Sequence, residues 1–429
     1  MSTIEIQPVA APPNARIRPP GSKSLTNRAL VCAALARGTS TLEGVLESDD
    51  TRVMIEALGA LGVPIRVDHH THVAEVSGCG GKIPAASADL YVANSGTTVR
   101  FLTALVALAH GTFRLHGTPR MHERPIGDLL DALAQLGVRA ESEAGNGCPP
   151  VVVRAAGLKR SKASMRAHVS SQFLSGLLMA APCADGKAGA PLEIEILGSL
   201  VSKPYVEMTL AVMRAFGAKV DADRDLTRFE IAPGGYSPRR YEIEPDASAA
   251  SYFWAAAAIT GGRVLVEGLG RSSLQGDVAF CDCLARMGAN VHEDWRGTTV
   301  EGGRLVGIDV DMNAISDTVQ TLASVSLFAE GPTNIKNVAH IRHQETDRIT
   351  ALATELRKLG AAVEERADGL RIVPGVPRGA EIDTYDDHRM AMSLALVGLK
   401  IPGVVIRDPQ CTAKTYPGFW DDLARLRRV

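Results

Sequence analysis

The sequence lacks any hydrophobic run of the roughly 18–20 residues that a transmembrane helix requires. It also carries almost no net charge, because 46 Lys and Arg residues oppose 48 Asp and Glu residues, a formal charge of −2. We therefore expect no membrane span and no broad nucleic-acid-binding face, since such a face requires an excess of positive charge. Any anionic ligand must be bound by positive charges that gather locally.

Cysteine is scarce, with seven residues at irregular spacing. An odd, scattered set argues against a disulfide framework and predicts a reducing compartment, the cytoplasm. No signal peptide is expected, because residues 1–20 contain prolines and scattered charges instead of an apolar stretch. Cys281 and Cys283 are interpreted as ordinary helix residues and the histidines within residues 69–72 as a solvated turn, because neither group has the spacing of zinc ligands. No metal site is predicted.

The length excludes a single small domain. One hydrophobic core rarely grows beyond about 250–300 residues, so 429 residues indicate two or more domains. A composition of 45% hydrophobic and 22% charged residues is ordinary for globular proteins and excludes a collagen-like, coiled-coil or wholly disordered chain.

A helix-ending pattern recurs along the chain at intervals of roughly 70–80 residues, a spacing typical of repeated structural units. It consists of a leucine-like residue, two others, an apolar residue and then glycine, with a degenerate copy at residues 423–426. The complete copies end at Gly62, Gly137, Gly217, Gly288 and Gly360. Each is typical of an amphipathic helix with a glycine C-cap, followed by a strand.

A second series of helices lies between these copies and begins with small polar residues. The helix bodies are expected at residues 29–35, 101–108, 173–180, 252–259, 319–328 and 390–399. Because they are apolar on all sides, we expect them to be buried. Six units of one buried helix, one surface helix and several strands predict an α/β protein with three units in each of two domains, the chain crossing near residues 237–241. A single large α/β domain with coincidental helix ends is the alternative.

The beginnings of the buried helices carry residues that suit anions. The first N–H groups of a helix are unpaired and partly positive, so they form ready anion sites. The polar starts lie at residues 21–28, 94–100, 170–172, 317 and 387–389. Cations accompany the surface helices at Arg120, Arg124, Lys203, Arg342, Arg348 and Lys414. One such residue alone could be a solvated arginine or an ordinary cap, but their recurrence in both halves predicts an anion-lined cleft between two domains.

Asp317 and Glu345 are carboxylates among these cations. Paired carboxylates in a cationic site suit general acid and base catalysis. A local ion pair between Glu345 and Arg348, three residues apart, is the alternative for Glu345. Nearby cations lower the pKa of a carboxyl, whereas a proton donor needs a raised one, and a doubly anionic ligand could offset the arginines.

Taken together, the motifs resemble the 5-enolpyruvylshikimate-3-phosphate synthase family over about residues 17–419. In order they are GSKSLTNRAL, NSGTTVR, RPIGDL, SSQFLSGLLM, SKPYVEMT, DAS, QETDR, TYDDHRMAM and CTAKTYPGF. The resemblance implies two similar domains, each with three βαβαββ repeats around buried parallel helices, an inside-out α/β barrel. The implied domains are residues 22–240, and residues 1–21 with 241–429, with the active site in the cleft between them.

The resemblance also implies a reaction: transfer of enolpyruvyl from phosphoenolpyruvate to the 5-hydroxyl of shikimate 3-phosphate, through a tetrahedral intermediate and with release of phosphate. It implies no metal or organic cofactor, and we expect a monomer. Asp317 is the implied proton acceptor, Glu345 the proton donor, and Lys23 touches both substrates. The implied shikimate 3-phosphate contacts are Lys23, Ser24, Arg28, Ser170, Ser171, Gln172, Ser202, Tyr205, Asp317, His340 and Gln344. The implied phosphoenolpyruvate contacts are Lys23, Gly96, Arg124, Gln172, Arg348, Arg389 and Lys414.

The sequence departs from the family pattern at three positions. Gln344 replaces the usual Lys, His340 stands where Asn is common, and Phe101 replaces a common Pro. An amide can still bind a hydroxyl, so we expect activity with an altered charge balance around Asp317. The rival interpretations are a UDP-N-acetylglucosamine enolpyruvyl transferase, which should have a Lys-Asn pair near its start, and a non-catalytic anion-binding protein. The shikimate-type motifs and the retained carboxylates argue against both.

Overall fold

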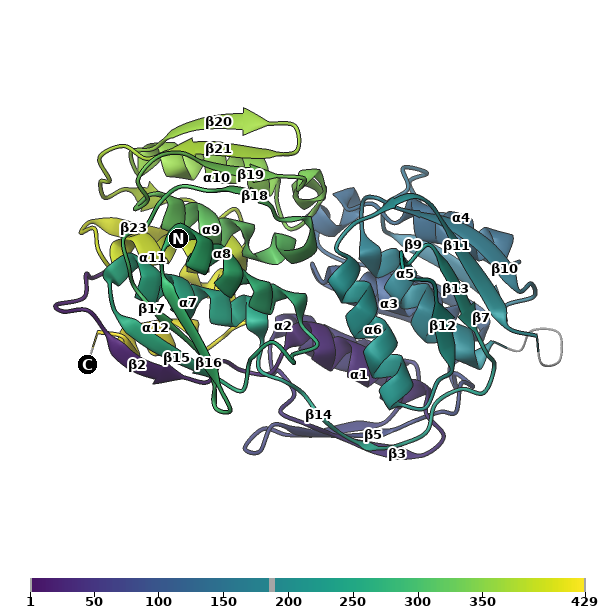
Figure 1. The fold of residues 1–429 in the computed structure, drawn as a ribbon. Helices are drawn as coiled ribbons and strands as arrows, with labels where there is room; N and C mark the ends of the chain where they lie inside the picture. Colours follow the sequence, from purple (N-terminus) through teal and green to yellow (C-terminus); the bar gives the residue numbers. More distant parts are fainter. Residues whose placement is uncertain (1, 185–189, 428–429) are drawn as a thin grey trace. The chain divides into compact units, whose positions relative to one another are not determined.

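The computed structural model describes residues 2–184 and 190–427, and the chain divides into two compact units. The central unit is Gly21–Ile243, and the terminal unit combines Met1–Pro20 with Glu244–Val429. Both are built from sheets and helices that alternate along the chain, which confirms the predicted α/β class (Figure 1). Among the helices in this part of the chain, none combines the length and the apolar character needed to cross a bilayer.

Three sheets show the complete βαβαββ repeat. In each, the first two strands are parallel, the fourth strand lies antiparallel beside the second, and the third lies at the edge. Two belong to the central unit: β6 (Ser87–Tyr91), β7 (His110–His116), β9 (Val151–Ala156) and β8 (Arg139–Ser142); and β10 (Lys162–Ala167), β11 (Leu192–Leu200), β13 (Arg228–Ile231) and β12 (Val220–Ala222). The third belongs to the terminal unit: β18 (Asp309–Asp311), β19 (Thr333–Lys336), β21 (Gly369–Val373) and β20 (Ala362–Arg366).

Two further sheets exchange their first strands. The strand β2 (Asn14–Ile17) precedes α1 (Lys23–Leu35) but pairs with β15 (Arg263–Glu267) of the terminal unit. The strand β14 (Arg240–Glu242) precedes α7 (Ala247–Thr260) but pairs with β3 (Thr39–Glu43) of the central unit. Their other strands are β5 (Val73–Ser77), β4 (Ile65–Asp68), β17 (Gly297–Glu301) and β16 (Asn290–Asp294). The chain therefore passes between the units after β2 and again after β14.

The last sheet is completed by the beginning of the chain. The strand β23 (Val404–Arg407) pairs in parallel with β22 (Glu381–Ile382) and antiparallel with β1 (Thr3–Ile6). A strand from the N-terminal segment thus takes the place that the fourth strand of a complete repeat occupies. This pairing joins residues 1–20 to the terminal unit.

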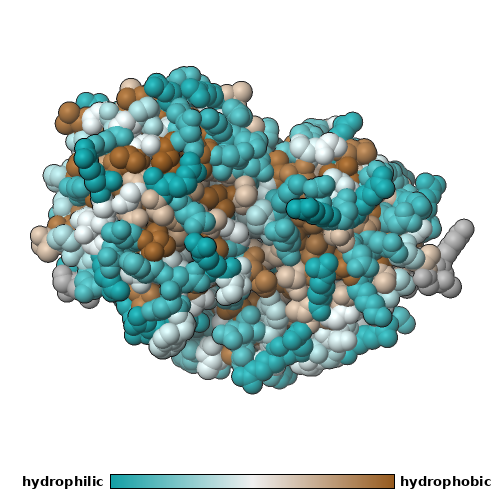
Figure 2. All heavy atoms as spheres, viewed as in Figure 1, coloured by the Kyte–Doolittle hydropathy of each residue, from teal (hydrophilic) through white to brown (hydrophobic). Residues whose placement is uncertain are grey.

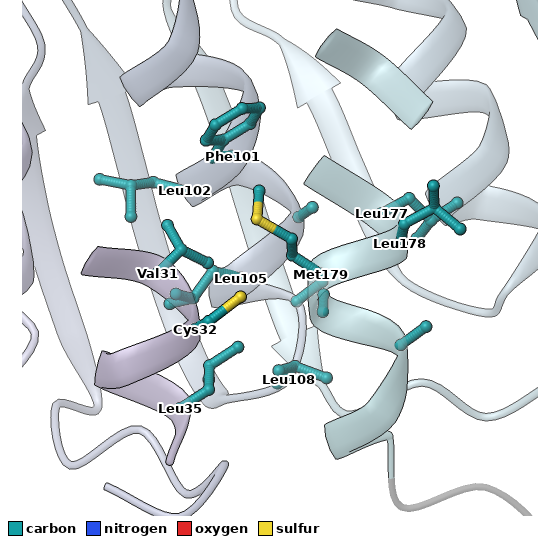
Figure 3. Packing of buried hydrophobic residues seen from close by; sticks show 14 of the residues in the cluster. Val31, Cys32, Leu35, Phe101, Leu102, Leu105, Leu108, Leu177, Leu178 and Met179 are labelled. Atoms are coloured by element: carbon teal, nitrogen blue, oxygen red, sulfur yellow. The ribbon is translucent and has the colours of Figure 1, made fainter. Parts of the chain in front are cut away.

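Each unit contains three helices that are buried on nearly every side. They are α1, α3 (Gly96–Val106) and α5 (Ser171–Ala180) in the central unit, and α7, α9 (Val319–Ser326) and α11 (His388–Gly398) in the terminal unit. Figure 3 shows Val31, Leu35, Leu105, Leu108 and Met179 packed between α1, α3 and α5. These helices confirm the interpretation of the apolar segments as buried.

A second set of helices covers the sheets and ends where the glycine pattern predicted. They are α2 (Asp49–Ala60), α4 (Gly127–Gln135), α6 (Lys203–Ala215), α8 (Phe280–Met287) and α10 (Arg348–Lys358), with α12 (Phe419–Arg425) as the degenerate sixth. Gly62 follows α2 with φ +87° and Gly288 caps α8 with φ +108°, a left-handed conformation that glycine adopts without steric cost. Hydrophilic side chains predominate on the visible face of each unit, as Figure 2 shows.

Close approach of α3 and α5 predicts an asymmetric response to glycine replacement. A Cβ at Gly176 would lie 2.8 Å from the carbonyl oxygen of Arg100, whereas a Cβ at Gly59, in α2, meets nothing within 4 Å. We expect Gly176→Ala to destabilise the protein by about 1–3 kcal/mol through overpacking. We expect Gly59→Ala to stabilise it by up to about 1 kcal/mol, because alanine loses less backbone entropy in a helix. Urea unfolding followed by circular dichroism measures both, and equal effects of the two variants would contradict the packing argument.

Candidate active site

Lys23 lies at the first residue of α1, in the central unit. Ser22 caps this helix by accepting a hydrogen bond from the backbone N–H of Leu25 at 3.4 Å. The Nζ of Lys23 is 3.4 Å from Oδ2 of Asp50, which lies in the first turn of α2. Both side chains are largely buried, at 13% and 4% exposure, so Asp50 holds the ammonium at the start of the helix.

Arg28 lies just over one turn further along α1 and is only 1% exposed. Its guanidinium donates to Oγ1 of Thr209 at 2.7 Å and to the carbonyl oxygens of Ser24 at 2.9 Å and Tyr205 at 3.1 Å. It also lies over the rings of Phe101 and Tyr205. Burial lowers the pKa of Arg28 to about 10. Each of its hydrogen-bond acceptors within the described residues is uncharged, so this buried cation is well suited to an anionic ligand.

Two guanidiniums lie at the start of α3, beside Gly96. The helix is capped by Ser95, and a Cβ on Gly96 would lie 2.6 Å from an amino nitrogen of Arg124 and 2.9 Å from one of Arg100. Arg124 donates to the backbone oxygen of Asn94 at 2.8 Å and to its side-chain oxygen at 3.1 Å. A side chain at this position would displace the two guanidiniums, which fill the space that glycine leaves.

The sequence reasoning did not single out Arg100 as a site residue. Arg100 donates to Oε1 of Gln172 at 2.7 Å and to the carbonyl oxygen of Pro125 at 3.1 Å, and it lies over the ring of Phe173. It therefore orients Gln172, a predicted contact. Arg28 and Arg100 occupy nearly equivalent places just beyond the first turns of α1 and α3, and that correspondence was the signal that could have identified Arg100.

Four more predicted residues lie at the starts of α5 and α6. Ser170 caps α5 and accepts from the backbone N–H of Gln172 at 3.2 Å, and Ser171 is the first residue of the helix. Ser202 precedes α6 in a left-handed conformation, φ +52°. A non-glycine residue in this conformation is strained, and such strain often accompanies functional sites. Tyr205 contributes its carbonyl oxygen to Arg28.

The predicted cation series divides into two classes. Arg124 and Arg348 are buried, at 3% and 1% exposure. Arg120 instead pairs with Glu123 on the 3-10 helix Pro119–Glu123, and Arg342 pairs with Asp347 and Glu365 near the surface. Lys203 is exposed. Arg120 and Arg342 thus have carboxylate partners nearer the surface and Lys203 is exposed, whereas Arg124 and Arg348 are buried.

Arg348 is the centre of the charged cluster in the terminal unit. It is the first residue of α10, and its Nε and one amino nitrogen donate to the two oxygens of Asp387 at 2.8 and 3.2 Å. Asp387 is fully buried and caps α11 by accepting from the backbone N–H of Arg389 at 2.9 Å. The sequence alone gave Asp387 no partner, and this bidentate ion pair ties the start of α10 to the start of α11.

The two candidate catalytic carboxylates contact the same guanidinium. Arg348 donates to Oε2 of Glu345 at 2.9 Å and to Oδ1 of Asp317 at 3.4 Å, and also to Oε1 of Gln344. Burial alone would lower the pKa of Arg348, but Asp387, Glu345 and Asp317 outweigh burial and raise it above its ordinary value. The local pair between Glu345 and Arg348, considered from the sequence as an alternative, is therefore present as part of a larger network.

Two more cations complete this network. Arg389 donates to Oδ2 of Asp317 at 2.7 Å, and Nζ of Lys414 lies 3.8 Å from Oε1 of Glu345. Asp317 lies in the 3-10 helix Asn313–Thr318 just before α9, and Lys414 ends the 3-10 helix Pro409–Lys414. The charged cluster is hereafter the set Asp317, Glu345, Arg348, Asp387, Arg389 and Lys414.

His340 is a neutral neighbour of the charged cluster. It is 7% exposed, and burial lowers its pKa to about 4, while Asp317 opposes this shift. The structure thus brings together every predicted site residue of the terminal unit: Asp317, His340, Gln344, Glu345, Arg348, Arg389 and Lys414. The predicted residues of the central unit lie at the starts of α1, α3, α5 and α6 and beside Gly96.

The histidines and cysteines that the sequence analysis rejected as metal ligands have ordinary environments in the structure. His69 and His72 contact the carboxylate of Glu47 in an exposed turn. Cys281 and Cys283 are buried in α8. Within residues 2–184 and 190–427, no three His, Cys, Asp or Glu side chains are arranged to hold a metal ion.

Comparison with known proteins places this arrangement in a family. Residues 10–423 match the family described as EPSP synthase (3-phosphoshikimate 1-carboxyvinyltransferase). The 3-phosphoshikimate 1-carboxyvinyltransferases of Nostoc punctiforme and Ralstonia nicotianae are 49% and 48% identical, each over 98% of both chains. The solved EPSP synthase of Acinetobacter baumannii superposes with a TM-score of 0.81 at 25% identity, over 99% of this chain and 98% of that one.

A more distant structure shares the fold alone. The enolpyruvyl transferase NikO from Streptomyces tendae has a TM-score of 0.78 at 21% identity, over 98% of this chain and 96% of that one. The family match and the curated relatives carry the assignment beyond fold, and they agree with the shikimate-type motifs rather than with the sugar-nucleotide alternative. The chain belongs to the EPSP synthase family.

Proposed function

We propose that the predicted residues of the two units are the substrate-binding and catalytic groups of one reaction. That reaction transfers the enolpyruvyl group of phosphoenolpyruvate to shikimate 3-phosphate, a step in aromatic biosynthesis. The observation that carries this proposal is the charged cluster, in which the side chains of three cations and three carboxylates are each less than one-fifth exposed. The two groups of residues act on the same pair of substrates.

Phosphoenolpyruvate is the ligand we assign to the cations of both units. Its carboxylate and phosphate require several fixed positive charges, and cations already held by the protein stabilise them without reorganisation. We assign this role to Lys23, Gly96, Arg124, Gln172, Arg348, Arg389 and Lys414. Gly96 contributes by leaving room beside the guanidinium of Arg124.

Shikimate 3-phosphate is the ligand we assign to the serine-rich helix starts. Hydroxyl groups and unpaired N–H groups at a helix start suit a phosphate, and the buried cation of Arg28 supplies the charge. We assign this role to Lys23, Ser24, Arg28, Ser170, Ser171, Gln172, Ser202, Tyr205, Asp317, His340 and Gln344. Gln344 and neutral His340 supply polar contacts without a charge at this side of the ligand.

The chemistry we propose is addition followed by elimination. Asp317 accepts the proton of the 5-hydroxyl as its oxygen attacks C2 of phosphoenolpyruvate, and Glu345 donates a proton to C3, which becomes a methyl group. The tetrahedral intermediate then loses a proton from C3 and expels phosphate, which restores the double bond. Lys23 contacts both substrates and holds them in register.

The charged cluster explains how a carboxylate among cations can donate a proton. Without ligand, the carboxylates of Asp317 and Glu345 are themselves the counter-charges of Arg348, Arg389 and Lys414. A bound phosphoenolpyruvate competes for the same cations. As Glu345 loses its positive neighbours to the ligand, it becomes easier to protonate and suited to act as an acid.

We also infer that the reaction takes place in the cytoplasm on a monomeric enzyme. All seven cysteines lie in the described residues and are free thiols, as a reducing compartment favours.

Replacing Arg124 tests the assignment of phosphoenolpyruvate. We expect Arg124→Ala to raise the KM for phosphoenolpyruvate by about 10- to 100-fold, because a charge-assisted hydrogen bond is lost. Arg120→Ala is the matched control, since Arg120 lies on the adjoining 3-10 helix and pairs with Glu123. The KM of this variant for phosphoenolpyruvate should change less than about twofold. Phosphate release with both substrates measures the kinetics. Equal KM values for the two variants would remove Arg124 from the binding site.

Replacing Asp317 tests the proton transfer. We expect Asp317→Asn to lower kcat by about 10²- to 10⁴-fold, because the amide cannot accept the hydroxyl proton. The KM for phosphoenolpyruvate should not rise, since Asn removes a charge that competes with the ligand for Arg348 and Arg389. Asp347→Asn is the control, because Asn also caps a helix well and Asp347 caps α10 outside the charged cluster. A near-normal kcat for Asp317→Asn would discard its role as base.

Burial of His340 predicts a pH effect on stability. Its pKa is about 4 when folded, below its ordinary value of 6.5, so the unfolded state binds more protons between these values. Stability is therefore complete above about pH 6.5 and is lost as the pH falls toward 4. Between pH 7 and pH 5, His340→Asn should lose about 2 kcal/mol less unfolding free energy than the unmodified protein. Urea unfolding at both pH values measures this difference, and parallel losses would contradict the neutral state of His340.

A further inference from the structure

Tyr252, in α7, carries a buried hydroxyl that the assignments above do not use. Its side chain is 1% exposed, and its ring contacts that of Phe419 edge-on at 5.6 Å. Arg389 approaches the hydroxyl oxygen as a donor, but no residue that the structure describes accepts a hydrogen bond from the hydroxyl itself. Buried hydroxyls are almost always paired, because an unpaired one costs free energy, so this group calls for a partner outside the protein.

The hydroxyl of Tyr252 lies near the charged cluster, close enough for the charges of Arg389 and Arg348 to act on it. Its neighbour Ser251 contacts the hydroxyl of Thr321 at 3.0 Å, and Thr321 contacts that of Ser393 at 3.2 Å. Thr321 and Ser393 each lie four residues, about one helical turn, after Asp317 and Arg389. The buried helices α7, α9 and α11 therefore meet about one turn beyond the charged cluster, and Tyr252 lies next to this meeting point on α7.

The charges around Tyr252 favour a hydrogen-bond donor. Burial raises the pKa of its hydroxyl to about 12, while the positive charges of Arg389 and Arg348 lower it by less and the carboxylate of Asp246 raises it. The phenol is therefore neutral at physiological pH and keeps its proton. The two guanidiniums beside it can only donate, and no carboxylate of the described residues, Asp246 included, accepts the O–H, so a ligand oxygen would supply the acceptor.

We propose that the hydroxyl of Tyr252 donates a hydrogen bond to an anionic oxygen of the ligand held by Arg348 and Arg389. In this role Tyr252 is an additional binding residue for phosphoenolpyruvate. Its oxygen faces Arg389, which acts on the hydroxyl as a hydrogen-bond donor, so the proton is left to be donated to the ligand. The inference rests on the proposed function, which assigns the ligand of these two arginines.

The variant Tyr252→Phe removes only the hydroxyl. We expect the KM for phosphoenolpyruvate to rise about tenfold, as for loss of one hydrogen bond to a charged group. The kcat and the KM for shikimate 3-phosphate should change less than about twofold. Without ligand, Tm should stay the same or rise, because an unpaired buried hydroxyl is removed. The increase in Tm that phosphoenolpyruvate causes should be smaller than in the unmodified protein.

Tyr416→Phe is the matched control within the same aromatic cluster. Tyr416 is 2% exposed, and its hydroxyl donates to Oδ2 of Asp422 at 2.6 Å. Removing that hydroxyl should lower Tm and leave the KM for phosphoenolpyruvate unchanged, which is the pattern of a purely structural hydroxyl. The same pattern in Tyr252→Phe would overturn the proposal.

Arg389→Lys separates the failure of this inference from that of the proposed function. If Arg389→Lys raises the KM for phosphoenolpyruvate and Tyr252→Phe does not, the role of Tyr252 is wrong and the ligand assignment stands. If neither variant raises it while both remain folded by circular dichroism, the assignment of phosphoenolpyruvate to Arg389 is wrong, and the inference fails with it. A rise in both, with the Tm pattern above, supports the inference.

Discussion

The buried ion pair of Arg348 and Asp387 is the interaction on which the terminal unit's site depends. Taking either charge out of water is costly, and removing one partner would leave the other buried and uncompensated. The pair is held by two hydrogen bonds, and each partner stands at the start of a helix, α10 or α11. The guanidinium is thereby fixed on rigid elements, so that the amino nitrogen it shares with Asp387 also holds Glu345 and the other amino nitrogen holds Asp317.

The charged cluster is itself electrically balanced, as the chain as a whole nearly is. Three cations gathered in one buried place would repel one another, and the protein supplies three carboxylates beside them. Of these, Asp387 is fully buried and caps a helix, so we assign it a fixed structural charge. Asp317, at 18% side-chain exposure, is accessible to a substrate. A neutral sum is thus compatible with a strongly anionic ligand, because in the mechanism we propose the ligand takes the place of carboxylates that the protein already contains.

Much of this arrangement could be predicted from local sequence, and the remainder depends on distant partners. Helix ends at Gly62 and Gly288 follow from backbone conformation, and burial of α3 or α7 follows from apolar residues on every side. The exchange of β2 and β14 left no local signal, because each pairs with a strand about 200 or more residues away, and only the family resemblance implied that the N-terminal segment belongs to the second domain. Arg120 and Arg124 look alike in sequence, and only the tertiary fold separates the surface pair from the buried cation.

Two buried arginines show why the units make different contributions. Arg28 and Arg348 are each 1% exposed, yet burial lowers the pKa of Arg28 to about 10, whereas three carboxylates raise that of Arg348. Arg28 is surrounded by neutral oxygens and gains a counter-charge only when an anion binds. Arg348 already has counter-charges and can only exchange one for another. The central unit is therefore suited to holding a phosphate, while the terminal unit is suited to releasing carboxylates for proton transfer at the moment a ligand replaces them.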